Sequence, residues 1–390
     1  MSIEKSEIFV SGGGLAGKTA AIALSQAGWE VTLCAPKTDW VDQRTTAFLW
    51  DTIDFFKSLG LWEALCERAF PLKTMRIVDG TSRLLRAPQV DFNATEIDIP
   101  AFGYNLRNRD ILETADVALK QAGVKRVNGS VYSVEETDAG YELSLSVESN
   151  DCKMLCRFLV GADGRNSLVR NTLFPGERRW TYPQHAFVVD FKHDLSTQFV
   201  STEFHTETGP FTIVPHGPHK AGLVWLETPQ RVLEVCNMSQ SDIERLLEDK
   251  MQSYLGKVRL TSNPASFPIE GLIANTFGAN NAAIVGEAAH VFPPIGAQGF
   301  NLGARDIRDL VDTLKRHTSG ENRGQIYHQS RMTDVQTRTL GVDMLNRSLL
   351  SGFLPNQLLR TGGLYALGKI GPMRKMAMRM GISPAFSLNG

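Results

Sequence analysis

The sequence is poor in cysteine, nearly neutral overall and without long apolar runs, and each shortage removes a class of protein. Its five cysteines are odd in number and scattered, so neither a disulfide framework nor a zinc site is expected. A formal net charge of -1 provides no basic field for nucleic acid. There is no basic leader and no run of about 18 apolar residues, and we expect a reduced, cytoplasmic protein that does not span a membrane.

What is present is enough for an ordinary globular protein of two domains. The chain has 390 residues, of which 42% are apolar, and no change of composition marks disorder. Its eight histidines show no spacing that is typical of metal ligands, so no metal is expected.

The most informative segment covers residues 285–306 and reads VGEAAHVFPPIGAQGFNLGARD. An apolar strand over 282–285 leads into Gly286-Glu287, a loop of glycine and proline, and a helix that begins near 299–301. Small residues let the backbone approach a flat ligand, and a helix start offers free N–H groups and a positive dipole end. Such a site suits a ring that becomes negatively charged, as a reduced flavin does. His290 is expected to be a structural imidazole beside this site rather than a general base.

A second motif near the N-terminus predicts a compact βαβ unit between residues 7 and 34. Gly12, Gly14 and Gly17 have the spacing of a dinucleotide fingerprint, in which a pyrophosphate lies over the start of the helix. The acidic residue that usually follows the second strand and binds the adenosine ribose is missing, because residues 34–36 are Cys-Ala-Pro. No side chain can therefore be assigned to the ribose.

The same glycines allow a rival interpretation as a nucleotide triphosphatase. Gly12, Gly17, Lys18 and Thr19 also satisfy G-x-x-x-x-G-K-[ST], in which the lysine would contact phosphates and the threonine a magnesium ion. That site needs a further strand ending in a magnesium-binding aspartate. The candidate strands, 158–163 and 282–287, both belong to longer flavoprotein patterns, so we take Lys18 and Thr19 to be ordinary residues of the first helical turn.

A third motif covers residues 158–170, FLVGADGRNSLVR. An apolar strand leads into Gly161-Ala-Asp163-Gly164, and Arg165 and Arg170 follow on a turn and a helix. Either Asp163 and Arg165 contact a nucleotide cofactor, or Asp163 only forms a turn and both arginines are solvated.

Together the three motifs resemble those of the FAD-dependent aromatic hydroxylases of ubiquinone biosynthesis, relatives of the p-hydroxybenzoate hydroxylase fold. The family signature is His-Pro, an aliphatic, a small residue, then Gly-Gln-Gly-x-Asn-x-Gly-x-x-Asp. The chain matches it at Pro294, Ile295, Gly296, Gln298, Gly299, Asn301, Gly303 and Asp306. It departs in three places: Glu287 replaces an aspartate that contacts the ribityl chain in relatives, Pro293 replaces the histidine, and Ala297 replaces the first glycine of Gly-Gln-Gly.

The resemblance implies an α/β fold, with a Rossmann-like FAD-binding domain, an inserted antiparallel-sheet substrate domain and a helical C-terminal segment. It also implies an FAD-dependent monooxygenase that hydroxylates the aromatic ring of a polyprenylated phenol with NAD(P)H and O2, through a flavin C4a-hydroperoxide. Because the chain has a single dinucleotide fingerprint, NAD(P)H is expected to visit as a transient co-substrate. No catalytic side chain can be assigned.

Arg44 and Arg109 are assigned to the cofactor site on the resemblance alone. Arg44 could instead be a surface residue, and Arg107 competes with Arg109 for the same alignment. The residues assigned to FAD are Gly12, Gly14, Leu15, Ala16, Gly17, Arg44, Arg109, Asp163, Gly164, Arg165, Gly286, Glu287, Pro294, Gly296, Ala297, Gln298, Gly299 and Asn301.

The order of the motifs predicts a discontinuous flavin domain. We expect it to comprise residues 1–75, 100–180 and 270–335. Alternating strand-like runs place the substrate domain at 76–99 and 181–269. The resemblance implies that its sheet roofs the reactive face of the flavin. Residues 336–390 form the C-terminal segment.

From residue 345 onward the chain has basic residues but no acidic one, interspersed with leucine and methionine. This pattern is typical of helices at the surface of an anionic membrane, although packing against the flavin domain explains it equally well. We hypothesise a peripheral contact with the inner face of the membrane, with other proteins of ubiquinone biosynthesis as candidate partners. Two other functions stay open, a flavin-dependent prenyl reductase and a non-catalytic flavin-binding assembly subunit.

Overall fold

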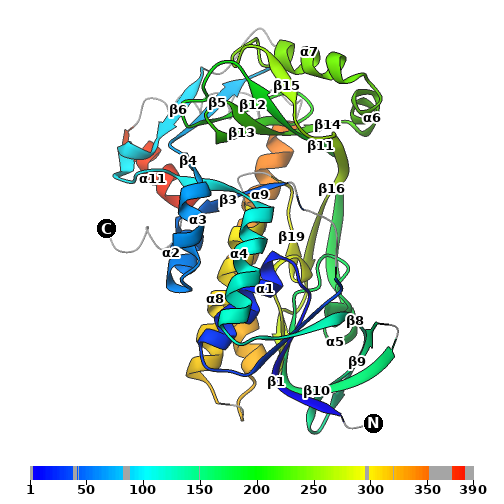
Figure 1. Cartoon of the computed structure of the whole chain (residues 1–390). Helices are drawn as coiled ribbons and strands as arrows, with labels where there is room; N and C mark the ends of the chain where they lie inside the picture. The colour runs from blue at the N-terminus through cyan, green and yellow to red at the C-terminus, as the bar shows by residue number, and fades with distance from the viewer. Residues whose placement is uncertain are drawn as a thin grey trace.

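The computed structural model describes residues 3–37, 42, 44–81, 88–148, 150–294, 298–318, 320–350 and 371–382. In Figure 1 a Rossmann-like unit lies at the bottom and a large sheet lies at the top, which is antiparallel except for the parallel pair β12 (Val200–His205) and β5 (Thr74–Asp79). Within the described part of the chain, no helix is long and apolar enough to cross a membrane.

The lower unit is built on a seven-stranded sheet in the order β1-β2-β8-β9-β10-β18-β17, and β1 also pairs with β10. Strands β1, β2, β10 and β18 pair in parallel, and their central residues are almost all buried apolar, as expected of strands covered on both faces. The strands are β1 (Glu4–Ser11), β2 (Val31–Ala35), β8 (Lys125–Thr137), β9 (Gly140–Val147), β10 (Asn150–Gly161), β17 (Gly278–Ala279) and β18 (Ala282–Ile284).

Helices pack around this sheet and set the position of the glycine-rich turn. Helix α1 buries the small residues Ala20, Ala21 and Ala23, which allows it to lie close to its neighbours. The helices of this unit are α1 (Leu15–Gln26), α2 (Trp50–Ser58), α3 (Trp62–Leu65), η1 (Cys66–Arg68), α4 (Asn108–Gln121), α5 (Leu168–Leu173), η3 (Gly286–Ala288), α8 (Gln298–Arg316) and α9 (Arg323–Leu350).

The upper sheet has the order β19-β16-β11-β14-β13-β12-β5-β6, with β15 beside β11. One face packs on α6 (Pro229–Cys236) and α7 (Gln240–Lys250), and the Ser239 side chain caps α7. The strands are β5 (Thr74–Asp79), β6 (Val90–Asn93), β11 (Glu177–His193), β12 (Val200–His205), β13 (Pro210–Gly217), β14 (Lys220–Glu227), β15 (Val258–Leu260), β16 (Ala265–Ala274) and β19 (His290–Val291).

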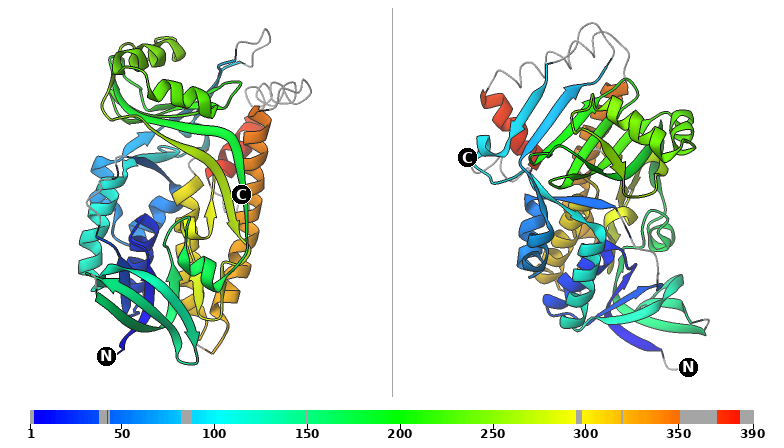
Figure 2. Two further views of the ribbon diagram at one scale, coloured as in Figure 1. Left: turned by 90° about the vertical axis from the view of Figure 1, so that its right-hand side faces the viewer. Right: turned by 45° about the horizontal axis from the view of Figure 1, so that its top comes forward.

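A small sheet, β3-β7-β4, lies between the two units, formed by β3 (Thr45–Leu49), β4 (Phe70–Leu72) and β7 (Gly103–Arg107). Two further elements, η2 (Ala94–Ile97) and α11 (Gly371–Ile382), lie together beside β6. Figure 2 shows that α9 runs from the flavin unit towards the large sheet.

Four of the five expected domain boundaries need correction, because they fall inside continuous elements, whereas the boundary at 99–100 lies between η2 and β7. The boundary at 75 falls within β5, that at 180 within β11, that at 269 within β16 and that at 335 within α9. Strands β11 and β16 are long enough to pair from Glu177 beside the flavin unit up to the roof. The two units are therefore joined by a hydrogen-bonded ladder rather than by linkers.

Candidate flavin site

The glycine fingerprint is held in a shape that other residues could not adopt. Gly12 has φ +117°, and a Cβ on it would lie 2.2 Å from the carbonyl oxygen of Ala162. A Cβ on Gly17 would lie 1.8 Å from the carbonyl oxygen of Gly12. Two glycines thus let the start of α1 approach the ends of β1 and β10.

The N-terminus of α1 is left open for an anion. Its N-cap is Gly14, and among the described residues no side chain caps the helix and no acidic residue occupies its first turn. No described atom lies within 4 Å of a Cβ built on Gly14. The backbone N–H groups of Leu15 and Ala16 begin this turn, so the cradle fits the pyrophosphate of FAD.

Lys18 and Thr19 do not serve a triphosphate. The Lys18 ammonium lies 2.6 Å from a carboxylate oxygen of Asp116 on α4, and its side chain is only 11% exposed. The Thr19 hydroxyl donates to the carbonyl of Leu15 at 2.8 Å. Lys18 is therefore a buried ion-paired residue, not an ordinary residue of the first turn, and both side chains are committed to helix packing.

A cavity of about 260 Å³ adjoins this turn, where the adenosine half of FAD would lie. Its lining explains why no acidic residue stands at the end of β2. A Cβ on Gly13 would lie 2.4 Å from the Cβ of Ala35, so the glycine turn packs closely against the end of this strand. Strand β8, parallel to β2, contributes Arg126 and Asn128 to the lining, and α4 contributes Arg109. Sequence patterns did not reveal β8 as part of this lining, because its order in the sheet is a property of the whole fold.

Arg44 and Arg109 lie on the same side of the molecule but are differently held. Arg44 forms a two-pronged pair with Asp42, at 2.9 and 2.7 Å, and Asn108 donates to the same carboxylate at 2.9 Å. Burial opposes ionisation of Asp42, but the hydrogen bonds from Arg44 and Asn108 outweigh it and hold its pKa below the ordinary value. Arg109 is 61% exposed and pairs with Glu113. Contacts of Arg44 and Arg109 with FAD stay predictions.

The two carboxylate oxygens of Asp163 have different surroundings. One oxygen accepts hydrogen bonds from the backbone N–H groups of Leu168 and Val169, at 2.8 and 3.2 Å, and so caps α5. The other is buried and has no hydrogen-bond partner among the described residues. An unpaired buried carboxylate oxygen beside Gly164 suits a cofactor hydroxyl or amide. Asp163 is thus a turn former whose second oxygen fits the predicted contact.

The two arginines of this motif have separate roles. Arg170 is only 2% exposed, donates to the carbonyl of Ala288 at 3.0 Å and pairs with Glu177 at 2.8 Å. The alternative in which Arg170 is solvated is therefore wrong, because its side chain links α5 to the loop after β18. Arg165 is 37% exposed and lies 3.5 Å from Glu287, so the third motif and the segment 285–306 meet at this pair.

Glu287, the replacement for the family aspartate, projects from η3 with 55% of its side chain exposed. Changing Glu287 to Ala should lower the affinity for FAD about tenfold, the worth of one charged hydrogen bond to a ribityl hydroxyl. The thermal midpoint of the apoprotein should stay the same, since so exposed an ion pair contributes less than about 1 kcal/mol. Flavin fluorescence titration and thermal unfolding measure the two.

Glu270 provides the matched control, because its carboxylate also lies 3.4 Å from Arg165. Glu270→Gln should leave the FAD affinity unchanged. Equal losses of affinity in both variants would mean that the state of Arg165, and not a contact of Glu287, is what matters.

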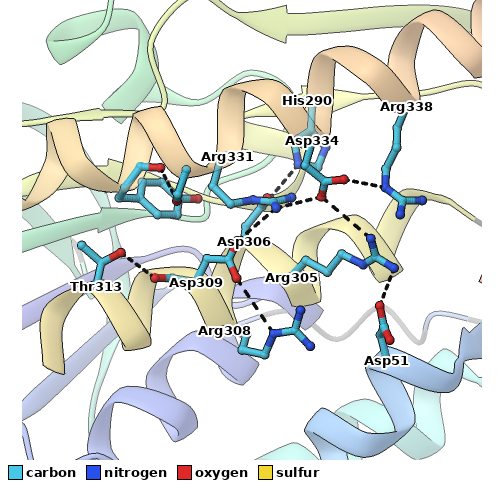
Figure 3. Close-up of polar contacts among 12 residues, drawn as sticks. Asp51, His290, Arg305, Asp306, Arg308, Asp309, Thr313, Arg331, Asp334 and Arg338 are labelled. Atoms are coloured by element: carbon cyan, nitrogen blue, oxygen red, sulfur yellow. Dashed lines mark hydrogen bonds and ion pairs between the residues drawn. The ribbon is translucent and has the colours of Figure 1, made fainter. Parts of the chain in front are cut away.

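Behind this loop lies a buried charge cluster centred on Asp306 (Figure 3). One of its oxygens accepts from the backbone N–H of Gly286 at 3.0 Å and lies 2.6 Å from His290 Nε2, and the other accepts from Arg331 at 2.9 Å. Burial would raise the pKa of Asp306, but His290, Arg331 and the Gly286 N–H hold it below its ordinary value. His290 is thus the structural imidazole that was expected.

The signature loop is described only in part. Gly296 and Ala297 lie outside the described residues, and of Gln298 only the backbone, at the first position of α8, is described. Pro294 and Gly299 are exposed on either side. The amide of Asn301 accepts from the N–H of Leu49 at 2.9 Å and donates to the carbonyl of Ala47 at 2.8 Å, so this side chain ties α8 to β3. Their contacts with the isoalloxazine stay predictions.

The inner face of the large sheet, opposite to α6 and α7, roofs this site. Residues of the inner face alternate along each strand with residues that form the buried core of the outer face. The inner-face residues Val188, Val224 and Leu226 belong to a separate apolar cluster with Tyr182 and Ile269. Sequence alternation predicted the strands. It could not identify the lining, because both faces of this sheet are largely apolar.

Two titratable residues lie where the roof meets the small sheet. Burial raises the pKa of Asp190 to about 6, against the opposing effect of Arg107, and burial together with Arg107 lowers the pKa of His216 to about 4. Because the folded-state pKa of Asp190 lies above its ordinary 3.8, its stabilising effect is complete below pH 3.8 and is lost as the pH rises through about 6.

Asp190→Asn should therefore raise the thermal midpoint at pH 8, and its advantage should disappear below about pH 4. His216→Asn should behave in the opposite way, gaining on the wild type only as the pH falls from 6.5 towards about 4. Calorimetric melts from pH 4 to 8 check both. Parallel curves for the wild type and Asp190→Asn would show that Asp190 titrates as it does in the unfolded chain.

Comparison with known proteins agrees with this geometry. The family described as FAD binding domain matches residues 5–337. The 3-demethoxyubiquinol 3-hydroxylase of Escherichia coli is 28% identical over 97% of this chain and 99% of its own length. The ubiquinone hydroxylase UbiL of Rhodospirillum rubrum is 28% identical over 96% of this chain and 88% of its own. A crystal structure of p-nitrophenol 4-monooxygenase PnpA from Pseudomonas putida superimposes with a TM-score of 0.81, at 16% identity, over 96% and 97% of the two chains.

Fold and site thus define an FAD-dependent aromatic-ring monooxygenase of the p-hydroxybenzoate hydroxylase type. The chain belongs to the FAD binding domain family, whose match spans all three motifs. The predictions of fold, cofactor and enzyme class are confirmed, and the triphosphatase interpretation is wrong.

Proposed function

We propose that this protein hydroxylates the aromatic ring of a polyprenylated phenol in ubiquinone biosynthesis, with NAD(P)H and O2 as co-substrates. The observation that carries the proposal is the similarity, over almost the entire chain, to the Escherichia coli 3-demethoxyubiquinol 3-hydroxylase. The apolar patch of Val188, Val224 and Leu226 on the roof supports it, because an apolar ring and its chain need such a wall.

When bound, FAD supplies the redox chemistry, in which NAD(P)H and O2 insert one oxygen into the ring and leave NAD(P)⁺ and water. The chain supplies binding, orientation and charge. The uncapped start of α1 would bind the pyrophosphate. The start of α8 would offer backbone N–H groups to the flavin, and the roof would exclude water and orient the phenol.

The test uses the purified flavoprotein, a short-chain 2-prenylphenol, NADH or NADPH, and ¹⁸O2. Mass spectrometry should find a product with one labelled oxygen on the ring. Addition of two hydrogens to the prenyl chain would indicate a reductase. Failure to bind FAD after reconstitution would indicate an assembly subunit, and either outcome would overturn the proposal.

We further propose that α11 contacts an anionic membrane. One face of this helix is docked on the protein: Arg374 pairs with Glu96 at 2.7 Å, and Met378 is buried against η2. The other face presents Lys375, Met376 and Arg379 to solvent, and Met376 is 58% exposed. Basic and apolar groups side by side favour a lipid surface. Residues 351–370, which belong to the same basic segment, lie outside the described residues.

Removal of the basic segment by truncation after Asp343 would also remove the end of α9. Charge reversal on α11 tests the membrane contact without shortening a helix. Lys375→Glu/Arg379→Glu should abolish flotation with vesicles that contain anionic lipid. The control is Lys315→Glu/Arg316→Glu, the same change of charge at the exposed end of α8. Equal flotation of both double variants and the wild type would contradict the membrane contact.

A further inference from the structure

The roof carries a carboxylate–imidazole pair, in which the imidazole is buried and the carboxylate half-buried, and the cofactor site does not use it. On β12, His205 Nε2 lies 2.8 Å from a carboxylate oxygen of Glu203, and the two side chains are 7% and 23% exposed. The Thr212 hydroxyl of the neighbouring β13 donates to the other oxygen of Glu203 at 3.3 Å. The pair is thus built into the sheet and not a chance surface contact.

Strand register places this pair on the inner face. Glu203 is opposite Thr212, Thr212 is opposite Val224, and Val224 is opposite Val188, so the four side chains form one row across β12, β13, β14 and β11. Val188 and Val224 belong to the inner apolar cluster, whereas their sequence neighbours Phe187 and Trp225 pack on the outer face beneath α6 and α7. His205 follows Glu203 by two residues and therefore shares its face.

The second ring nitrogen of His205, Nδ1, is available as a hydrogen-bond acceptor. Nδ1 is buried and has no hydrogen-bond partner among the described residues, although leaving a polar atom unpaired in a folded interior is unfavourable. Because the Glu203 carboxylate favours the tautomer with the proton on Nε2, Nδ1 carries the lone pair.

Ring hydroxylation by an electrophilic oxygen proceeds faster on a phenolate than on a phenol, because the ionised oxygen enriches the ring with electrons. We propose that His205 accepts the phenolic proton of the substrate and that Glu203 positions and stabilises it, an inference that rests on the proposed function. The O–H bond breaks, its electron pair stays on the phenolate oxygen, and the proton moves to Nδ1. The proton returns to the oxygen when the hydroxylated product leaves.

The surroundings favour His205 over the other inner-face histidine. His216 lies 3.8 Å from Asp190 but is faced by the cations Arg107 and Lys220 and by His193, which oppose a second positive charge. Around His205 the named groups are acidic or neutral: Glu203 on its own strand, Thr212 on β13, and Asp79, its register partner on β5, which accepts from Thr81 at 2.6 Å. None of these named neighbours of His205 is a cation.

The experiment measures the ionisation of a bound phenol in the oxidised FAD-loaded enzyme, without turnover. The probe is 2-prenylphenol, and its phenolate is detected by the red-shifted ultraviolet band in a difference spectrum across a pH series. In the wild type, the probe should ionise at least about one pH unit below its value in water, a tenfold gain. His205→Asn and Glu203→Gln should abolish the shift and lower turnover by about 100-fold or more.

Two controls separate proton transfer from packing. The O-methyl ether of the probe has no proton to lose, so it should bind the wild type and both variants equally. His185→Asn changes a histidine in the outward row of β11 with Phe187, and should leave the ionisation shift intact. Flavin absorbance reports whether each variant has folded around FAD.

The outcomes distinguish this inference from the proposed function. An unchanged ionisation shift in His205→Asn, with FAD bound, would overturn the role of His205 alone. Weaker binding of the ether by the same variant would mean that His205 only packs against the ligand, and would also overturn it. Failure of the wild type to bind any phenol would instead overturn the proposed function.

Discussion

Asp306→Asn is expected to lower the free energy of unfolding by about 3–5 kcal/mol, because it leaves the Arg331 guanidinium buried without its full countercharge. Arg331 is 3% exposed and Asp306 is 1% exposed, so water cannot take the place of the carboxylate. The same change weakens the acceptor for the Gly286 N–H, so FAD affinity should fall as well. Urea unfolding of the apoprotein and a flavin titration measure the two effects.

Asp312→Asn is the control, because Asp312 lies on the same helix and takes part in none of the contacts of Asp306. It should lie within about 0.5 kcal/mol of the wild type. Since the pKa of Asp306 lies below the ordinary 3.8, the loss should be complete at neutral pH and should shrink only below that value. Equal stability of the two variants at pH 7 would show that Arg331 does not depend on Asp306.

Asp306 also shows how far sequence reasoning reached. The signature identified it as the last matched position, and the same motif gave Gly286 and Asn301. None of these assignments revealed that Asp306 binds Arg331, a residue 25 positions further along the chain on α9. Motifs report local geometry around a ligand. The supports behind them come from elements that meet only in the folded chain.

The same limit applies to the roof. Alternation predicted strands in the region of β12, β13 and β14, because turns and apolar spacing depend on the local sequence. Which face meets the flavin depends on the register of β12 against β13 and on the position of α6 and α7. Glu203 and His205 therefore looked like any two polar residues of a strand, and only the fold puts them in one buried row.

The second large effect is expected at the fingerprint. Gly12→Ala should yield a protein that purifies without FAD and unfolds at a lower temperature, because its Cβ would lie 2.2 Å from the Ala162 carbonyl oxygen at a φ of +117°. No side chain can move to relieve a clash with backbone. Flavin content and thermal melts measure both consequences.

Gly14→Ala separates the role of the cradle in binding from its role in folding. Its φ of -71° suits alanine, and no described atom lies within 4 Å of the new Cβ, so the apoprotein should melt as the wild type does. The methyl group nevertheless enters the space over the start of α1 where the pyrophosphate would lie, and FAD affinity should fall by about 100-fold, roughly 2.7 kcal/mol. Unchanged FAD affinity in Gly14→Ala would contradict that placement, whatever Gly12→Ala does, because only this variant alters the cradle without straining the backbone that forms it.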